Sequence, residues 1–204
     1  MLQTQAVSPN TLELLKKLQS LNELKKFRLV GGTALALLFG HRLSVDLDFF
    51  SYDTPLPEQF QAILRKEGIQ IENVSLSNRI NIFNLNEVKT DFVNYSYKWL
   101  KNPILEQEYT LASIEDIAAM KLSAITNRGT KKDFVDLFFL LEIFELKQMI
   151  NLYHKKYPEA TDFLLFKSLI YFEDAEKDPM PKMLKPIEWQ QVKTRLTEIA
   201  RIGF

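Results

Sequence analysis

The stretch FRLVGGTALALLFGHRLSVDLDFFS, residues 27–51, combines two features that an ordinary buried core does not require. The glycine pair Gly31 and Gly32 ends a short apolar strand and precedes a short apolar helix. The apolar strand that follows carries Asp46 and Asp48, one residue apart. A strand that is otherwise apolar has no structural need for two neighbouring acids, so the pair points to a function.

The acid pair suggests a cation. On a strand, residues two apart point to the same face, so we expect Asp46 and Asp48 to share a face about 6.5–7 Å apart. Val45, Leu47 and Phe49 are expected on the opposite face, toward the core. Two carboxylates at that distance repel unless one is protonated or a cation lies between them, and Mg²⁺ prefers oxygen ligands. An Asp-x-Asp motif is also compatible with a solvated strand face that has no role.

A third acid stands on a later strand. Asp91 lies in the alternating segment EVKTDFVNY, with Lys89 on the same predicted face. If this strand neighbours the one that carries Asp46 and Asp48, three carboxylates meet. Three acids can hold two Mg²⁺ ions, which clamp the attacking and leaving oxygens of a phosphoryl displacement. The alternative for Asp91 is a charge on an edge strand.

The glycines suggest a phosphate site. Gly31 and Gly32 precede a helix that Thr33 can cap and that runs to Phe39, before Gly40. The free N–H groups at a helix start can bind phosphate, and glycine allows close approach. A plain strand-to-helix turn remains the alternative. A P-loop is excluded because no Lys-Ser/Thr pair follows the glycines.

Lys121 emerges from an apolar helical stripe formed by Ile117, Ala124 and Ile125. A lysine in that position either extends to solvent or meets a buried anion, which a triphosphate would supply. Arg128 follows seven residues later along the same face and can extend a positive track.

Two acids follow at the start of the next helix. Thr130 and Asp133 form a capping-box pattern, which alone accounts for an acid at that position. Asp136 lies on a helix that is otherwise apolar almost all round, so we expect it to meet a cation, with Arg128 or Lys132 as candidates.

Two basic side chains separate the end of the glycine helix from the acidic strand. His41 is expected to pack or to lie on the surface more often than to act as a base. Arg42 is expected to pair with Asp46 or to meet a phosphate.

The composition excludes several kinds of site. The 204 residues contain 26 Lys plus Arg and 26 Asp plus Glu, so overall basicity does not support nucleic-acid binding, although a local patch can. The absence of cysteine excludes disulfides and Cys-ligated metals, and two histidines argue against a His-rich zinc site. The N-terminus lacks a basic start before an apolar run, and no stretch approaches about 18 apolar residues. We therefore expect a cytoplasmic protein without a membrane anchor.

The chain divides into a mixed half and a helical half. Leucine spacing near the N-terminus and the segment 57–67 predict helices, and three alternating segments within 69–95 predict an antiparallel run of strands. Helices are then predicted at 113–127, 131–146, 147–156, 160–171 and 187–202. This organisation predicts an αβ domain over 1–110 and a helical domain over 111–204, with the boundary near Leu105 to Ser113.

These motifs together resemble a known family. GGTALALLFGHRLSVDLDFF is similar to the first signature of DNA-polymerase-β-like nucleotidyltransferases, and its HR-x-S-x-D-x-D-F-F form resembles the AbiEii toxin branch of type IV toxin–antitoxin and abortive-infection systems. MKLSAITNRGTKKDFVDLFFLL resembles that branch's helical signature, and SLIYFEDAEKDPMPKML its C-terminal region. The resemblance runs from about Phe27 to Trp189. It implies an α+β fold, with a nucleotidyltransferase-like mixed sheet and flanking helices followed by a C-terminal helical bundle.

The resemblance also implies roles at the matched positions. Asp46 and Asp48 would bind two Mg²⁺ ions, and Asp91 would be the third metal-binding carboxylate, able to take the proton from the attacking hydroxyl. Lys121 and Asp133 match the helical signature, where the lysine resembles a phosphate-contacting residue and the aspartate resembles an essential one. The candidate nucleotide-binding residues are Gly31, Gly32, Thr33, Arg42, Lys121 and Arg128.

We therefore expect a magnesium-dependent nucleotidyltransferase that moves a nucleoside monophosphate from an NTP to a hydroxyl of RNA, such as a tRNA end, or of a protein. As a toxin it would pair with a cognate antitoxin. The clusters Lys25–Lys26–Arg28 and Lys131–Lys132, with Lys182 and Lys185, could contact acceptor phosphates.

Two alternatives remain open. A haloacid-dehalogenase-type phosphohydrolase also uses Asp-x-Asp after an apolar strand, although that motif usually begins its domain and is followed by Thr or Val, whereas Phe49 and Phe50 follow here. A non-catalytic nucleotide-binding module predicts that Asp46→Asn and Asp48→Asn leave biological activity intact.

Overall fold

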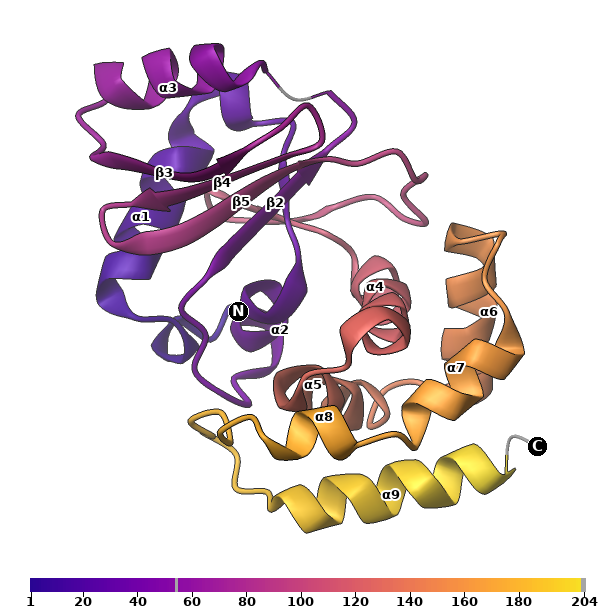
Figure 1. Cartoon of the computed structure of the whole chain (residues 1–204). Helices are drawn as coiled ribbons and strands as arrows, with labels where there is room; N and C mark the ends of the chain where they lie inside the picture. The colour runs from indigo at the N-terminus through magenta and orange to yellow at the C-terminus, as the bar shows by residue number, and fades with distance from the viewer. Residues whose placement is uncertain (54, 203–204) are drawn as a thin grey trace.

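The computed structural model describes residues 1–53 and 55–202. Within these residues a mixed sheet lies at one end of the molecule, and helices α4 to α9 gather at the other (Figure 1). The strands are β1 (Arg28–Leu29), β2 (Leu47–Ser51), β3 (Ile71–Leu76), β4 (Ile80–Leu85), β5 (Val88–Asn94), β6 (Ile104–Glu106) and β7 (Tyr109–Leu111). The helices are η1 (Thr4–Ala6), α1 (Pro9–Ser20), η2 (Asn22–Leu24), α2 (Gly31–Phe39), α3 (Pro57–Lys66), α4 (Ile114–Arg128), α5 (Lys131–Leu140), α6 (Leu146–Lys156), α7 (Asp162–Leu169), α8 (Glu173–Glu176) and α9 (Trp189–Ile202).

The strand order is β3-β4-β5-β2-β1-β7-β6. Strands β2 and β5 pair in parallel, as do β1 and β7, and the other neighbours are antiparallel. The predicted antiparallel run within 69–95 is confirmed as β3, β4 and β5. Because β2 lies beside β5, the condition set for Asp91 is met: Asp48 and Asp91 are direct cross-strand neighbours.

The two faces of the sheet differ in what covers them. On one face Phe49 and Phe92 stack with ring centroids 5.4 Å apart, and Phe60 of α3 packs 4.5 Å from Phe92. These rings are fully buried and form the core of the sheet half. The other face carries Asp48 and Asp91 and turns toward the helical half.

Strand β2 begins later than predicted. The structure confirms Leu47 as a core residue, but Val45 is 52% exposed and Asp46 precedes the strand. The backbone before Leu47 finds other partners, since the Ser44 N–H donates to the Ala6 carbonyl and the Thr33 hydroxyl donates to the Asp46 carbonyl. This segment is therefore held away from β5.

The helical half begins directly after β7, and its first helix is confirmed as α4, capped by the Ser113 hydroxyl. The helix predicted over 131–146 is too long, because α5 ends at Leu140. A new helix, α6, starts after Glu145, whose N–H donates to the Gln148 side chain as in a capping box.

Four short elements escaped the sequence pattern: η1, β6, β7 and α8. The two strands form a hairpin that turns at Gln107, with φ of 55°, and Leu111 then pairs in parallel with Leu29 of β1. Strands of three residues are too short to show an alternating pattern. No helix among the described residues has the length and apolarity that crossing a membrane requires.

Candidate active site

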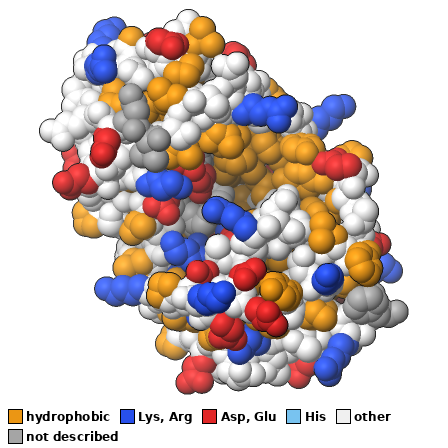
Figure 2. Space-filling model, in the orientation of Figure 1, with side chains coloured by type: hydrophobic (Ala, Val, Ile, Leu, Met, Phe, Trp, Pro, Cys, Tyr) orange, Lys and Arg blue, Asp and Glu red, His pale blue; other side chains and the backbone are white. Residues whose placement is uncertain are grey.

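A cleft of about 460 Å³ lies between the acid-bearing face of the sheet and the starts of α2 and α5. Acidic and basic side chains stand side by side on the surface between the two halves of the molecule (Figure 2). Most of the predicted site residues line this cleft: Gly32, Thr33, Arg42, Asp46, Asp48, Lys121, Arg128 and Asp133. The remaining two, Gly31 and Asp91, lie beside Asp48.

Asp48 and Asp91 form an acid pair across two parallel strands. Their Cα atoms are in register, which places them about 4.8 Å apart across the ladder. Asp91 Oδ2 accepts from Lys89 Nζ at 3.2 Å, whereas Asp91 Oδ1 is buried and has no hydrogen-bond partner. Burial, together with the charge of Asp91, raises the pKa of Asp48 to about 6.

Asp46 stands apart from this pair. It precedes β2, and its carbonyl rather than its carboxylate is fixed, by Thr33. In the described part of the chain no three His, Cys, Asp or Glu side chains are grouped as a ready ion site. The predicted convergence of Asp46, Asp48 and Asp91 on one point is therefore wrong: Asp48 and Asp91 form a cross-strand pair, and Asp46 lines the same cleft outside that pair.

The glycines make room for the charged side chains of the cleft itself. Gly31 has φ of 69°, and a Cβ there would lie 2.6 Å from Asp48 Oδ2. A Cβ on Gly32 would lie 2.2 Å from Arg42 Nη2. Because Gly31 allows the turn, α2 starts before Thr33, and the prediction that Thr33 caps it is wrong. The hydroxyl of Thr33 is buried and bonds to Ser44 and to the Asp46 carbonyl.

The start of α2 still presents free donors. Its N-cap residue, Val30, makes no side-chain cap, and the first N–H groups of a helix have no partner within the helix. An anion is therefore favoured at this point, directly beside Asp48.

A buried charge network closes the floor of the cleft. We use this name for His41, Arg42, Lys121, Asp133 and Asp136. Asp136 accepts from Arg42 Nε at 2.7 Å and Nη2 at 2.9 Å, from His41 Nε2 at 2.7 Å, and lies 2.6 Å from Lys121 Nζ. Burial alone would raise the pKa of Asp136, but Lys121 and Arg42 outweigh it and hold that pKa well below its usual value.

This network corrects several predicted pairings. Asp136 meets Arg42 and Lys121, rather than Arg128 or Lys132. Arg42 makes its bidentate pair with Asp136 instead of Asp46. The prediction that Asp136 meets a cation is confirmed. Its partners come from residues 94 and 15 positions earlier, which no local pattern reveals.

Asp133 both caps α5 and pairs with Lys121. Its Oδ2 accepts from the Thr130 hydroxyl at 2.6 Å and from the Thr130 N–H at 3.2 Å, which confirms the capping box. Its Oδ1 accepts from Lys121 Nζ at 2.9 Å. Lys121 therefore meets buried anions, as expected, and both anions are carboxylates of the protein itself.

Cations that remain unpaired line the rim. Arg128 and Lys132 are exposed, face the cleft and make no ion pair with any described residue. Lys131, which we expected to contact phosphate, is buried and donates to the Glu176 and Asp178 carbonyls. The unpaired positive charge of the cleft thus comes from the last residue of α4 and from the first turn of α5.

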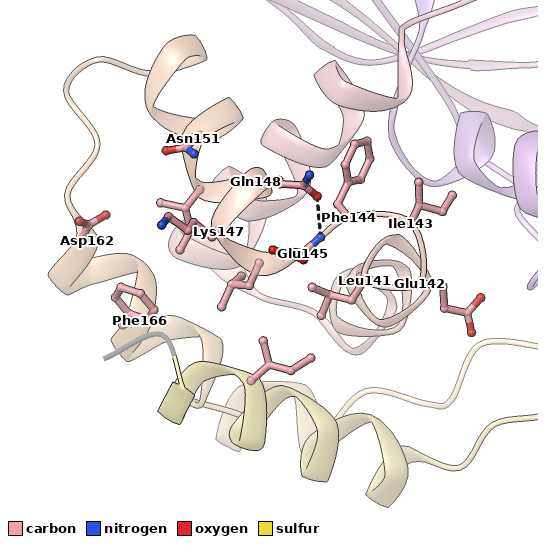
Figure 3. A pocket seen from close by; sticks show the side chains of 13 residues that line it. Leu141, Glu142, Ile143, Phe144, Glu145, Lys147, Gln148, Asn151, Asp162 and Phe166 are labelled. Atoms are coloured by element: carbon pink, nitrogen blue, oxygen red, sulfur yellow. Dashed lines mark hydrogen bonds between the residues drawn. The ribbon is translucent and has the colours of Figure 1, made fainter.

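A larger cavity, of about 1060 Å³, lies in the helical half between the α5–α6 turn, α6, α7 and α9 (Figure 3). Two of its polar side chains serve the fold: Gln148 accepts from the Glu145 N–H, and Asp162 pairs with His154 at 2.6 Å. None of the predicted site residues lines this cavity, so the cleft beside Asp48 is the candidate active site.

Comparison with known proteins identifies the family of the chain. The family model described as "Nucleotidyl transferase AbiEii toxin, Type IV TA system" matches residues 13–102 and 79–201. An uncharacterized protein of Aquifex aeolicus is 37% identical over 171 residues, covering 81% of this chain and 83% of that protein.

Two solved structures share the fold. JHP933 from Helicobacter pylori has a TM-score of 0.62 at 18% identity, covering 96% of this chain and 92% of that one. MenT4, a nucleotidyltransferase toxin of Mycobacterium tuberculosis, has a TM-score of 0.55 at 14% identity, covering 95% and 86%. The α+β fold, with its mixed sheet and flanking helices, is thus confirmed as nucleotidyltransferase-like. With a family model matched along nearly its whole length, this chain belongs to the AbiEii family of nucleotidyl transferase toxins and is a nucleotidyltransferase.

Proposed function

We propose that this protein transfers a nucleoside monophosphate from an NTP to a hydroxyl of an RNA acceptor and releases pyrophosphate, as the toxin partner of a cognate antitoxin. The observation that supports this proposal most directly is the acid pair, Asp48 and Asp91, in register on neighbouring strands beside the free N–H groups of α2. An acid pair and an anion site that adjoin each other suit a substrate that carries phosphates and divalent cations.

The donor set fits Mg²⁺. Asp91 Oδ1 is buried without a partner, and the pKa of Asp48 is raised by burial and by its neighbour, so both carboxylates gain from a cation. Carboxylate oxygens are the ligands that Mg²⁺ prefers. We assign Asp48 and Asp91 as the principal ligands, with Asp46 as the third acid of the cleft. When bound, Mg²⁺ would neutralise charge on the transferred phosphoryl group.

The chain's own groups then position the substrate. The N–H groups that open α2, with Arg128 and Lys132, would hold the triphosphate. Asp91, besides holding the cation, would accept the proton of the attacking hydroxyl.

The buried charge network is proposed to position these groups. Lys121 and Asp133 link α4 to the first turn of α5, where Lys132 lies, and Arg42 packs against Gly32 at the start of α2. Their charges are already matched within the protein, so we assign them to holding the phosphate site in shape.

The phosphohydrolase alternative is not retained, because the family and the fold are those of nucleotidyltransferases. A non-catalytic module is distinguished from an enzyme by the test that follows.

The test is incubation with each α-labelled NTP, Mg²⁺ and total RNA, comparing the wild type with Asp48→Asn. Asp53→Asn is a matched control, since Asp53 is an exposed aspartate paired only with Lys26 on the surface. We expect label on RNA with the wild type and the control, and a loss of at least about 100-fold with Asp48→Asn. Equal labelling by all three, or no label on RNA or protein with any NTP, contradicts the proposal.

A further inference from the structure

The face of the sheet that bears the acid pair continues as a row of aromatic residues. On β2, Phe50 follows Asp48 on the same face, and Tyr52 comes two residues later. On β5, the same face carries Asp91 and then Val93, which pairs with Phe50. The alternation continues beyond β5 through Tyr95, Tyr97 and Trp99, and the Tyr95 N–H donates to the Ser51 carbonyl at the end of β2.

The rings form a connected surface. Ring centroids are 5.0 Å apart for Phe50 and Tyr95, 5.2 Å for Tyr95 and Trp99, and 6.2 Å for Tyr52 and Trp99. Tyr95 is buried and anchors the row, because its hydroxyl lies 3.0 Å from that of Tyr157 on α6. Tyr52 is 52% exposed, and Tyr97 and Trp99 are half-buried, so three rings reach the surface. We call Tyr52, Tyr97 and Trp99 the aromatic platform.

The three rings of the aromatic platform are accessible to solvent. Hydrophobic side chains gather in a hollow between the sheet half and the helical half, next to the charged cleft (Figure 2). Aromatic rings left accessible beside an active site, instead of packed into the core, indicate a surface that meets a ligand.

The charged side chains around Trp99 are positive, whereas the Tyr97 hydroxyl donates to Glu159 at 2.7 Å. The Arg28 guanidinium lies 4.3 Å from the centre of the Trp99 ring, and Lys98 and Lys101 flank that residue on the exposed side of the loop. The nearest buried acid, Asp116, is neutralised by Lys156 at 2.6 Å. Aromatic rings among unpaired cations match the bases and phosphates of single-stranded nucleic acid.

The position of the platform relative to the acids favours the acceptor strand. The phosphate-binding groups line the cleft on the α2 and α5 side of Asp48. In a phosphoryl displacement the nucleophile attacks in line, opposite the leaving pyrophosphate, so the acceptor comes from the other side of the acid pair. The cleft residues 42–46 precede β2, whereas Tyr52 follows its other end, so the platform lies on that side. Its three rings exceed what the single base of an NTP requires.

We propose that the aromatic platform binds the unpaired end of an RNA acceptor by stacking its terminal bases on Tyr52, Tyr97 and Trp99. This proposal deepens the proposed function and rests on it for the direction of attack, while base stacking itself can be measured without any reaction. It identifies the acceptor as single-stranded RNA, or a duplex with an unpaired end, rather than a protein.

The test measures binding of a short fluorescein-labelled single-stranded RNA by anisotropy, without NTP, to Tyr52→Leu and Tyr52→Phe. Both variants lose the hydroxyl that accepts from the backbone N–H of Trp99, so the two variants differ only in whether residue 52 has an aromatic ring. Because Tyr52 is largely exposed, both should fold, which melting curves verify. We expect the dissociation constant to rise by roughly 10-fold with Leu and to stay near the wild-type value with Phe.

A second arm measures steady-state transfer. We expect Tyr52→Leu to raise KM for RNA and to leave KM for the NTP unchanged. A rise confined to KM for the NTP would place the base of the incoming nucleotide on the platform. Transfer of label to protein at equal rates in Tyr52→Leu and Tyr52→Phe would indicate a protein acceptor. Either result overturns the inference, as does equal RNA binding by both variants. Ring-dependent binding without any transfer would instead uphold the platform and contradict the proposed function.

Discussion

Two groups of charges share one cleft and differ in how they are matched. In the buried charge network, Asp136 contacts two cations and a histidine, and Lys121 contacts two carboxylates. In the acid pair, the carboxylate of Asp48 has no hydrogen-bond or ion-pair partner among the described residues, and one oxygen of Asp91 is buried without one. Both groups lie within the same few elements, so burial alone does not explain the difference.

This difference indicates that the buried charge network stabilises the fold, whereas the acid pair binds a ligand. The network has two cations against two carboxylates, and the pKa of His41 is lowered chiefly by burial, which keeps the histidine neutral. The charges of the network are therefore matched within the protein, while His41 Nδ1 is buried without a hydrogen-bond partner. The acid pair places two carboxylates side by side, with Lys89 as the ion-pair partner of Asp91. Burial and the charge of Asp91 raise the pKa of Asp48 in spite of the nearby charges of Lys121 and Lys89.

The largest effect is expected from Asp136→Asn, which breaks the matched group. The substitution leaves Arg42 and Lys121 buried against Asp133 alone, and removing one partner from a buried ion pair costs about 3–5 kcal/mol. Chemical denaturation at pH 7 measures the loss. Asp53→Asn, the same change at an exposed ion pair, should alter stability by less than about 1 kcal/mol. If both variants lost a similarly small free energy of unfolding, the buried charge network would not be what stabilises the fold.

Asp48→Asn should have the opposite sign. An acid whose pKa is higher in the folded chain than in the unfolded chain binds its proton more tightly when folded. Wild-type stability without metal therefore falls as pH rises from about 4 to about 6. At pH 8 the substitution should stabilise the protein by up to about 3 kcal/mol, because one pKa unit corresponds to about 1.36 kcal/mol.

Melting curves at several pH values in chelator test this sign. The gain of Asp48→Asn over the wild type should shrink as pH falls from 6 to 4, where the wild-type carboxyl becomes protonated. A stability gain that does not depend on pH would show that the charged form of Asp48 does not destabilise the fold. A variant that loses activity and gains stability identifies a residue kept for function.

The sequence predicted much of this cleft because its signals are local. An acid two residues from another on a strand, and a Thr-x-x-Asp pattern before a helix, are determined by spacing, and the structure confirms Asp48 on the open face and Asp133 in its capping box. Likewise the rule that a buried acid requires a cation correctly predicted that Asp136 has cationic partners. The proposed roles of these residues still await the tests above.

What the sequence did not reveal depends on backbone geometry and on distant partners. Arg42 reaches Asp136 across 94 positions, and Gly31 starts α2 early because it adopts a positive φ. The aromatic platform did leave a signal, since Tyr95, Tyr97 and Trp99 alternate after β5. That alternation became meaningful only once β5 was seen beside β2.

The smallest expected effect is the stabilisation by Mg²⁺, which tests directly whether the acid pair binds a ligand. If the acid pair holds a divalent cation, Mg²⁺ at ten times its dissociation constant stabilises the wild type by about 1.4 kcal/mol. Asp48→Asn should lose this shift, and Asp53→Asn should keep it. Because Mg²⁺ competes with the proton on Asp48, the shift should also fade as pH drops below about 6. Asp46, which lines the cleft outside the pair, decides how many acids take part: if Asp46→Asn abolishes the shift as fully as Asp48→Asn does, the third acid is a ligand in its own right.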